Sequence, residues 1–280
     1  MSTLAVPDQR LQGSTGESNR PSPFLRLAGR LRSTLYRSGA IIGFLLVWEL
    51  VPQFVLEPSS RVFLPPLHEV LQALGKMIAS GDLGTHILAS LGRAAVGFTL
   101  AVLIGVPVGL VVAWFSKVGD FLNPLLEVFR NTAALALLPV FTLLLGIGEV
   151  SKVSIVVYAA FFPVLLNTIL GARSVDPLLI RAAKTLGLTS YEIFAKVVLP
   201  SSVPIIFTGV RMAGTSSVLV LIAAEMIGAK AGLGFLITNS QASFLIPKMY
   251  AAILTVAILG FTVNAALVAL ERHFSRWARA

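Results

Sequence analysis

The sequence predicts an all-α, polytopic membrane protein with six transmembrane helices, and three observations support this fold class. Of its 280 residues, 56% are hydrophobic and only 12% are charged, whereas roughly a quarter of the residues in a soluble domain are charged. The mean hydropathy is +0.86. Apolar runs of about 20 residues, the length that a helix needs to cross the hydrocarbon core, recur along the chain.

Six segments fit transmembrane spans when the chain is read from its N-terminus. Two apolar runs are interrupted by one charge each, Glu49 in the first and Arg211 in the fifth. Four runs carry no charge: 94–115, 131–148, 153–172 and 249–270. Within a membrane domain of residues 38–275, the expected spans are therefore about 38–56, 91–115, 122–147, 151–172, 202–226 and 248–270.

The distribution of Lys and Arg predicts the orientation of these spans, because basic residues collect on the cytoplasmic side. With the N-terminus inside, the inner segments hold fourteen of the 22 basic residues and the outer segments hold six. We therefore expect a disordered cytoplasmic tail (1–37), a cytoplasmic loop (173–201) and a cytoplasmic end (276–280). The net charge of +9 then faces anionic lipid on one side of the bilayer, and nucleic-acid binding is not expected.

Small residues predict close helix packing in two spans. The second span has Gly97, Ala101, Gly105, Gly109 and Ala113 at four-residue steps. The fifth repeats the pattern with Gly209, Ala213 and Ser217. Such seams let the backbones of membrane helices approach each other.

Polar groups at membrane depth mark a candidate translocation path. Ionisable side chains are costly there and usually face a cavity or a partner. A structural role is the alternative for each of them: some lie near helix ends, and others can pair within the fold. The candidate path residues are Glu49, Arg130, Asn131, Asn167, Arg211 and Glu225.

The chain carries no constellation typical of an enzyme. Its three histidines are scattered, cysteine is absent, and no glycine-rich phosphate loop ending in Lys and Ser or Thr is present. We therefore expect no metal, no cofactor and no nucleotide hydrolysis in this chain. Transport energy must come from an ion gradient or from another polypeptide.

The inner loop is longer than a turn between spans requires, and its sequence predicts two short helices. Asp176 and Pro177 start the first, which Gly187 ends. Thr189 or Ser190 caps the second. Because Ala183 and Gly187 lie four residues apart, we expect a bare patch that receives another surface.

This loop resembles the EAA loop of ABC-importer permeases, which reads Glu-Ala-Ala, three residues, Gly, nine residues, Ile, one residue, Leu-Pro. The spacing is kept by Arg181-Ala182-Ala183, Gly187, Val197 and Leu199-Pro200. The resemblance spans roughly residues 60–275. The stretches FLPPLHEVL, GIGEVSK, FFPVLLNT, GVRMA, LIAAEMIGA and GLGFLI are similar to the nitrate, sulfonate, taurine and bicarbonate branch.

The resemblance implies a type I ABC-importer permease fold in a prokaryotic inner membrane, with both termini in the cytoplasm. It implies a homodimer, two cytoplasmic ATPase subunits that bind ATP and Mg²⁺, and an extracytoplasmic binding protein that delivers a small anionic solute. The implied mechanism is alternating access. The residues that it assigns to ATPase coupling are Arg181, Ala182, Ala183, Lys184, Leu186, Gly187, Leu199 and Pro200.

Among the departures from the family pattern, two affect the coupling loop and the predicted spans. Arg181 stands where relatives have Glu, which suggests an acidic partner in the ATPase groove. Ala133 stands where relatives often have Pro, so nothing in the sequence enforces a helix break after Arg130.

The rival hypothesis is an ion-coupled secondary transporter in which Glu49 or Glu225 carries a proton.

Overall fold

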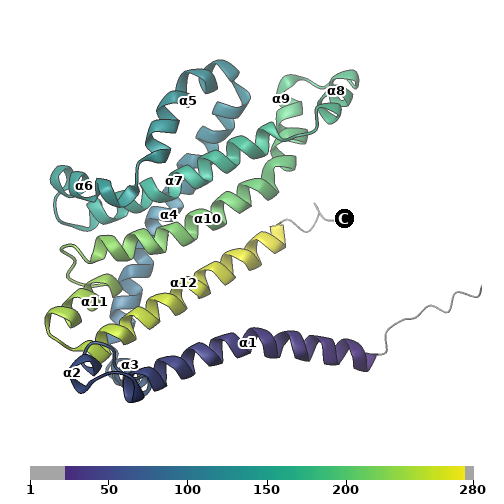
Figure 1. Ribbon diagram of the computed structural model, residues 1–280. Helices are drawn as coiled ribbons and strands as arrows, with labels where there is room; N and C mark the ends of the chain where they lie inside the picture. The colour runs from purple at the N-terminus through teal and green to yellow at the C-terminus, as the bar shows by residue number, and fades with distance from the viewer. Residues whose placement is uncertain (1–22, 275–280) are drawn as a thin grey trace, which may run out of the picture.

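The computed structural model describes residues 23–274, and every regular element among them is helical (Figure 1). The all-α prediction is confirmed. In chain order the elements are α1 (Pro23–Phe54), α2 (Pro58–Arg61), α3 (Leu67–Ala79), α4 (Asp82–Trp114), α5 (Ser116–Asn131), η1 (Ala134–Leu137), α6 (Leu138–Leu145), α7 (Glu149–Arg173), α8 (Pro177–Thr185), α9 (Ser190–Ile193), η2 (Phe194–Val198), α10 (Leu199–Glu225), α11 (Leu233–Ala242) and α12 (Ile246–Phe274).

The core consists of α4, α7 and α10, which lie side by side (Figure 1). The predicted small-residue seams make this packing. A Cβ added to Gly97 would lie 2.6 Å from Val156, and one added to Gly209 would lie 2.5 Å from the Cβ of Asn167. Both seams therefore pack against α7, which forms the middle of the three.

The two ends of this bundle carry different elements. At one end lie α2, α3, α6 and α11, and at the other lie α8 and α9 (Figure 1). We call these the α11 end and the α8 end. By the predicted orientation the α8 end is cytoplasmic.

Among residues 23–274, four helices are long and apolar enough to cross a membrane: α4, α7, α12 and the continuous helix Ser190–Glu225. The expected span 122–147 is instead the pair α5 and η1–α6, bent by 88°. It counts as a fifth span if the pair is taken together. The apolar part of α1, Gly39–Phe54, is shorter than a typical span. The predicted count of six is therefore not confirmed.

The break between α5 and η1 occurs without proline or glycine. Thr132 and Ala133 adopt extended backbone angles, with ψ values of 121° at both residues. The hydroxyl of Thr132 donates to Val128 O at 3.0 Å, so it satisfies a carbonyl at the end of α5. Polar side chains that bond to nearby backbone in this way compete with the helical ladder.

Helix α1 diverges from the bundle and contacts it at the α11 end (Figure 1). Trp48 Nε1 donates to Pro65 O at 3.2 Å. Of the expected disordered tail, residues 1–22 lie outside the described part of the chain, as does the expected end 276–280. Residues 23–37, which the sequence places in a disordered tail, are helical in the structure. Leu, Ala and Arg in this stretch favour a helix.

Candidate functional site

A cavity of about 440 Å³ lies between the α5–η1 break, α7 and α10. Its volume is in the range of small-molecule sites, roughly 300–1,000 Å³. Most of its lining is apolar, from residues such as Phe162, Leu166 and Val220. The polar side chains in the lining are Arg130, Thr132, Tyr158, Asn167 and Ser216.

The cavity is positioned by contacts that fix the helix break against α7. Tyr158 Oη donates to Phe129 O at 2.7 Å, which holds the last turn of α5 over α7. Asn167 Nδ2 donates to Pro163 O at 2.8 Å. Since Gly209 of α10 lies directly against Asn167, the side chain of Asn167 has little freedom to turn.

Arg130 supplies the only charge among the residues that line this cavity. Its guanidinium lies 3.0 Å from the carboxylate of Glu127, one turn earlier on α5. Both side chains are about half exposed, at 44% and 49%. The cavity therefore pairs an apolar wall with one accessible cation, a combination that suits a small anion.

The structure brings together two of the six predicted path residues, Arg130 and Asn167. Asn131 is adjacent, but its Nδ2 donates to Glu127 O at 2.8 Å and it does not line the cavity. Tyr158 and Ser216 were missed. Both lie in long apolar stretches, and hydroxyl groups there are too common to mark a path.

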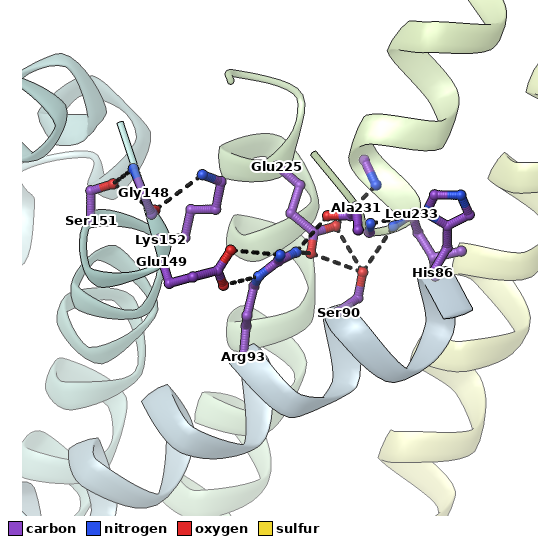
Figure 2. Close-up of polar contacts among 12 residues, drawn as sticks. His86, Ser90, Arg93, Gly148, Glu149, Ser151, Lys152, Glu225, Ala231 and Leu233 are labelled. Atoms are coloured by element: carbon purple, nitrogen blue, oxygen red, sulfur yellow. Dashed lines mark hydrogen bonds and ion pairs between the residues drawn. The ribbon is translucent and has the colours of Figure 1, made fainter. Parts of the chain in front are cut away.

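Glu225 does not line the cavity. It belongs to a polar network at the α11 end (Figure 2). Its carboxylate is fully buried. It accepts hydrogen bonds from Ser90 Oγ at 2.8 Å, Arg93 Nη1 at 2.6 Å and Gly234 N at 3.1 Å. A buried charge persists only when it is paired and hydrogen-bonded in this way. Glu225 therefore fits the structural alternative.

Arg93 joins three elements in this network. Its guanidinium reaches Glu149 of α7 through Nε and Nη2, Glu225 of α10 through Nη1, and Ala231 O before α11 (Figure 2). All three of its nitrogens are therefore occupied. Arg93 ties α4, α7 and α10 together at the α11 end.

The same network caps the N-terminus of α11. Leu233 N donates to Ser90 Oγ at 2.9 Å, and Gly232 N donates to His86 Nδ1 at 3.0 Å. Gly232 has a φ of +125°, and a Cβ there would lie 2.3 Å from an oxygen of Glu225. A carboxylate is favoured at a helix N-terminus because the free N–H groups point toward it.

Glu49 and Arg211 are also placed outside the cavity. Glu49 accepts from His68 N at 3.0 Å and contacts His68 Nδ1 at 2.7 Å, which joins α1 to the start of α3. Arg211 Nη1 lies 3.0 Å from Glu271 Oε2, which joins α10 to α12. Both pairs hold helices together.

The loop between α7 and α10 folds as predicted from its local sequence. The side chain of Asp176 accepts from Leu178 N at 2.8 Å, and Thr189 and Glu192 form a capping box. Gly187 has a φ of +81°. Gly187 N donates to Lys184 O, and Leu188 N donates to Ala183 O, which is the hydrogen-bond pattern of a Schellman motif.

The expected bare patch is not formed, and this part of the prediction was wrong. Ala183 is buried at 6% exposure, packed with Val175, Ile193 and Val198. Gly187 lies beyond the end of α8, so the two residues share no helix face. The physical reason is that the loop buries its own small core, which holds α8 against α9.

The remaining residues assigned to coupling fall into two groups. Leu199 and Pro200 are half-buried where the π-helical stretch η2 continues into α10. The exposed group covers the outside of α8 and the following turn: Arg181, Ala182, Lys184, Leu186 and Gly187. The exposed surface of this loop is therefore basic and partly apolar.

Within residues 23–274, no three His, Asp or Glu side chains gather as metal ligands.

Residues 105–279 match the family described as "binding-protein-dependent transport system inner membrane component". The chain is 35% identical over 246 residues to the taurine transport system permease protein of Escherichia coli K12, covering 85% of this chain and 88% of that protein. It is 31% identical over 242 residues to the nitrate import permease protein of a Synechocystis strain, covering 83% and 86%.

Among solved structures, the fold is similar to the inward-facing MetNI methionine ABC transporter. The TM-score is 0.61 with 19% identity, covering 69% of this chain and 95% of that chain. The structural likeness supports the fold, and the sequence matches identify the family. The chain therefore belongs to the binding-protein-dependent transport system inner membrane components, as a membrane-spanning permease subunit of an ABC importer in the branch that includes taurine and nitrate permeases.

Proposed function

We propose that this permease carries a small oxyanion, of the sulfonate or nitrate type, through the cavity at the α5–η1 break. The observation that carries the proposal is the single cation of the cavity, Arg130, set in a mostly apolar wall. Arginine presents several N–H donors in a plane that matches oxyanions. The relatives named for taurine and nitrate support the same class of solute.

The other cations near the path are already engaged. Arg93 uses all three of its nitrogens within the network at the α11 end. Arg211 is paired with Glu271 on α12. Arg130 also contacts one carboxylate through a single nitrogen, but unlike Arg211 it lines the cavity. Arg130 is therefore the cation whose remaining donors can reach a solute there.

The exposed surface of α8 is proposed to dock a separate ATPase subunit, which binds ATP and Mg²⁺. This places the α8 end and both termini in the cytoplasm of a prokaryotic cell. Two copies of the permease, two ATPase subunits and an extracytoplasmic binding protein complete the complex. Arg181 and Lys184 are exposed, so an acidic groove on the ATPase is the matching surface.

Proton coupling through Glu49 or Glu225 fits the structure less well. Glu225 is fully buried and receives three hydrogen-bonding groups. Glu49 is engaged by His68. Family membership also assigns the energy source to ATP.

The test of the path is Arg130→Gln in the complete transporter reconstituted in liposomes. Uptake of taurine, ethanesulfonate, nitrate and bicarbonate is measured with ATP inside and the cognate binding protein outside. We expect Arg130→Gln to lower uptake at least about tenfold, because one charge-assisted contact is lost, while Lys76→Gln, an exposed cation of α3, transports normally. Normal uptake by Arg130→Gln overturns the proposed path.

The test of docking is charge reversal on α8. Arg181→Glu with Lys184→Glu is expected to abolish co-purification of the ATPase subunit, because it opposes like charges across the interface. Lys196→Glu is the matched control, since Lys196 is exposed on the next segment. Undiminished co-purification of the double variant contradicts an acidic groove.

A further inference from the structure

Glu127 forms an ion pair with Arg130, the cation of the cavity. Its Oε2 lies 3.0 Å from Arg130 Nη2, and both residues lie in the last turns of α5. Within the described part of the chain, Glu127 is the only acid that forms an ion pair with Arg130. Arg130 lines the cavity whereas Glu127 does not, so the carboxylate approaches the guanidinium from outside the lining.

The contact leaves most of the guanidinium free. One nitrogen, Nη2, binds Glu127, whereas arginine carries five N–H donors in total. An oxyanion in the cavity can therefore bind the free edge before the carboxylate leaves.

The pair is also weak enough to exchange. Both side chains are about half exposed, and an ion pair of this kind changes an equilibrium by less than about fivefold. The ion pair of Arg93 with the fully buried Glu225 differs, because separating it leaves a buried charge without a partner. Arg93 is therefore held in place by its buried partner, whereas Arg130 can exchange its partner.

We propose that Glu127 is the resident counterion of Arg130, which yields the guanidinium to the anionic group of the solute and thereby weakens solute binding in the path. The inference rests on the proposed function, because it takes Arg130 as the anion contact. A path must hold its cargo weakly enough to release it. Glu127 supplies this weakening because its carboxylate already holds Nη2 of Arg130, which leaves the solute only the remaining donors until the carboxylate departs.

The test uses the absence of cysteine from the natural chain. Ser216→Cys places one thiol in the cavity lining. The full chain in lipid nanodiscs is treated with uncharged methyl methanethiosulfonate, which forms a mixed disulfide with the thiolate and releases methanesulfinate. Ethanesulfonate is titrated in as the anion probe, and the concentration that halves the labelling rate is measured. Ser243→Cys, exposed beyond α11, is the control thiol.

We expect ethanesulfonate to protect Ser216→Cys and to leave Ser243→Cys unprotected. Adding Glu127→Gln should lower the half-protecting concentration about threefold to fivefold, because losing a half-exposed ion pair changes a binding equilibrium by about that factor at most. Adding Arg130→Gln should abolish protection, and in that background Glu127→Gln should change nothing.

The outcomes separate the two proposals. If Arg130→Gln abolishes protection while Glu127→Gln leaves the half-protecting concentration unchanged, the counterion role is overturned and the anion path stands. If protection survives Arg130→Gln, or is absent from Ser216→Cys itself, the anion contact is overturned and the counterion role with it.

Discussion

Gly109 of α4 offers a sharp test of the packing that holds the bundle together. A Cβ added there would lie 2.7 Å from the Cβ of Thr168 and 3.0 Å from Leu165 O, both on α7. Neither neighbour is the end of a flexible side chain, so α4 and α7 must separate to admit the methyl group. Overpacking of this kind costs about 1–3 kcal/mol. Relative to a Gly→Ala change at an open position of the same helix, Gly109→Ala should lower the free energy of unfolding by that amount.

The matched control is Gly92→Ala on the same helix. A Cβ at Gly92 meets nothing within 4 Å, and Ala favours a helix over Gly by about 1 kcal/mol. The control should therefore be neutral or slightly stabilising. Both variants are compared with the parent by reversible unfolding in mixed micelles, followed by circular dichroism. Equal stability of Gly109→Ala and Gly92→Ala would refute the close approach of α4 and α7.

Three further predictions concern the α11 end, the α8 end and α1. Arg93→Gln leaves the carboxylate of Glu225 buried without its cation, and unfolding in micelles should show a loss of about 3–5 kcal/mol, partly recovered when Glu225→Gln is added; an unchanged midpoint would contradict the network. Gly187→Ala places a side chain at a φ of +81°, which costs about 1–2 kcal/mol. Because this strains the turn after α8, a pull-down should show weaker ATPase binding for Gly187→Ala than for the control Gly75→Ala, a helical glycine with open space beside it. Glu49→Gln keeps an acceptor for His68, so ATP-driven uptake should continue within about twofold in the presence of a proton uncoupler; its collapse would revive proton coupling.

The sequence predicts local features of this protein well because their causes are local. Asp176, Gly187 and Thr189 start, end and restart helices through contacts with residues two to four positions away. The small-residue seam at Gly97 and Gly109 is likewise visible in the spacing. For these features the structure adds the identity of the neighbour, which is α7.

The roles of the polar residues are less accessible from the sequence, because they depend on distant partners. Glu225 and Arg130 both stand at the edge of an apolar run. What separates them is that Glu225 meets Ser90 and Gly234, brought close by tertiary packing, whereas Arg130 meets a cavity. The sequence spacing of these residues does not predict the buried network around Glu225 or the cavity beside Arg130.

The sequence does not predict the helix break after α5 or the burial of Ala183, and the two failures have related causes. The break lacks proline and depends on Thr132 and on the hold of Tyr158 on Phe129 O. Ala183 looks available on a helical wheel, yet α9 folds back over it. In both places a contact from another element overrides the pattern of the segment itself.

The pairing of Arg93 with both Glu149 and Glu225 has a consequence for the order of events during synthesis of the protein. Its buried partner Glu225 follows it by 132 residues, whereas Glu149 follows it by 56. At roughly 5–20 residues per second of synthesis, Glu149 emerges about 3–11 s after Arg93 and Glu225 about 7–26 s after it. An ionisable group is costly in lipid without a partner, and in order of synthesis Glu149 is available to pair with Arg93 before α10 exists.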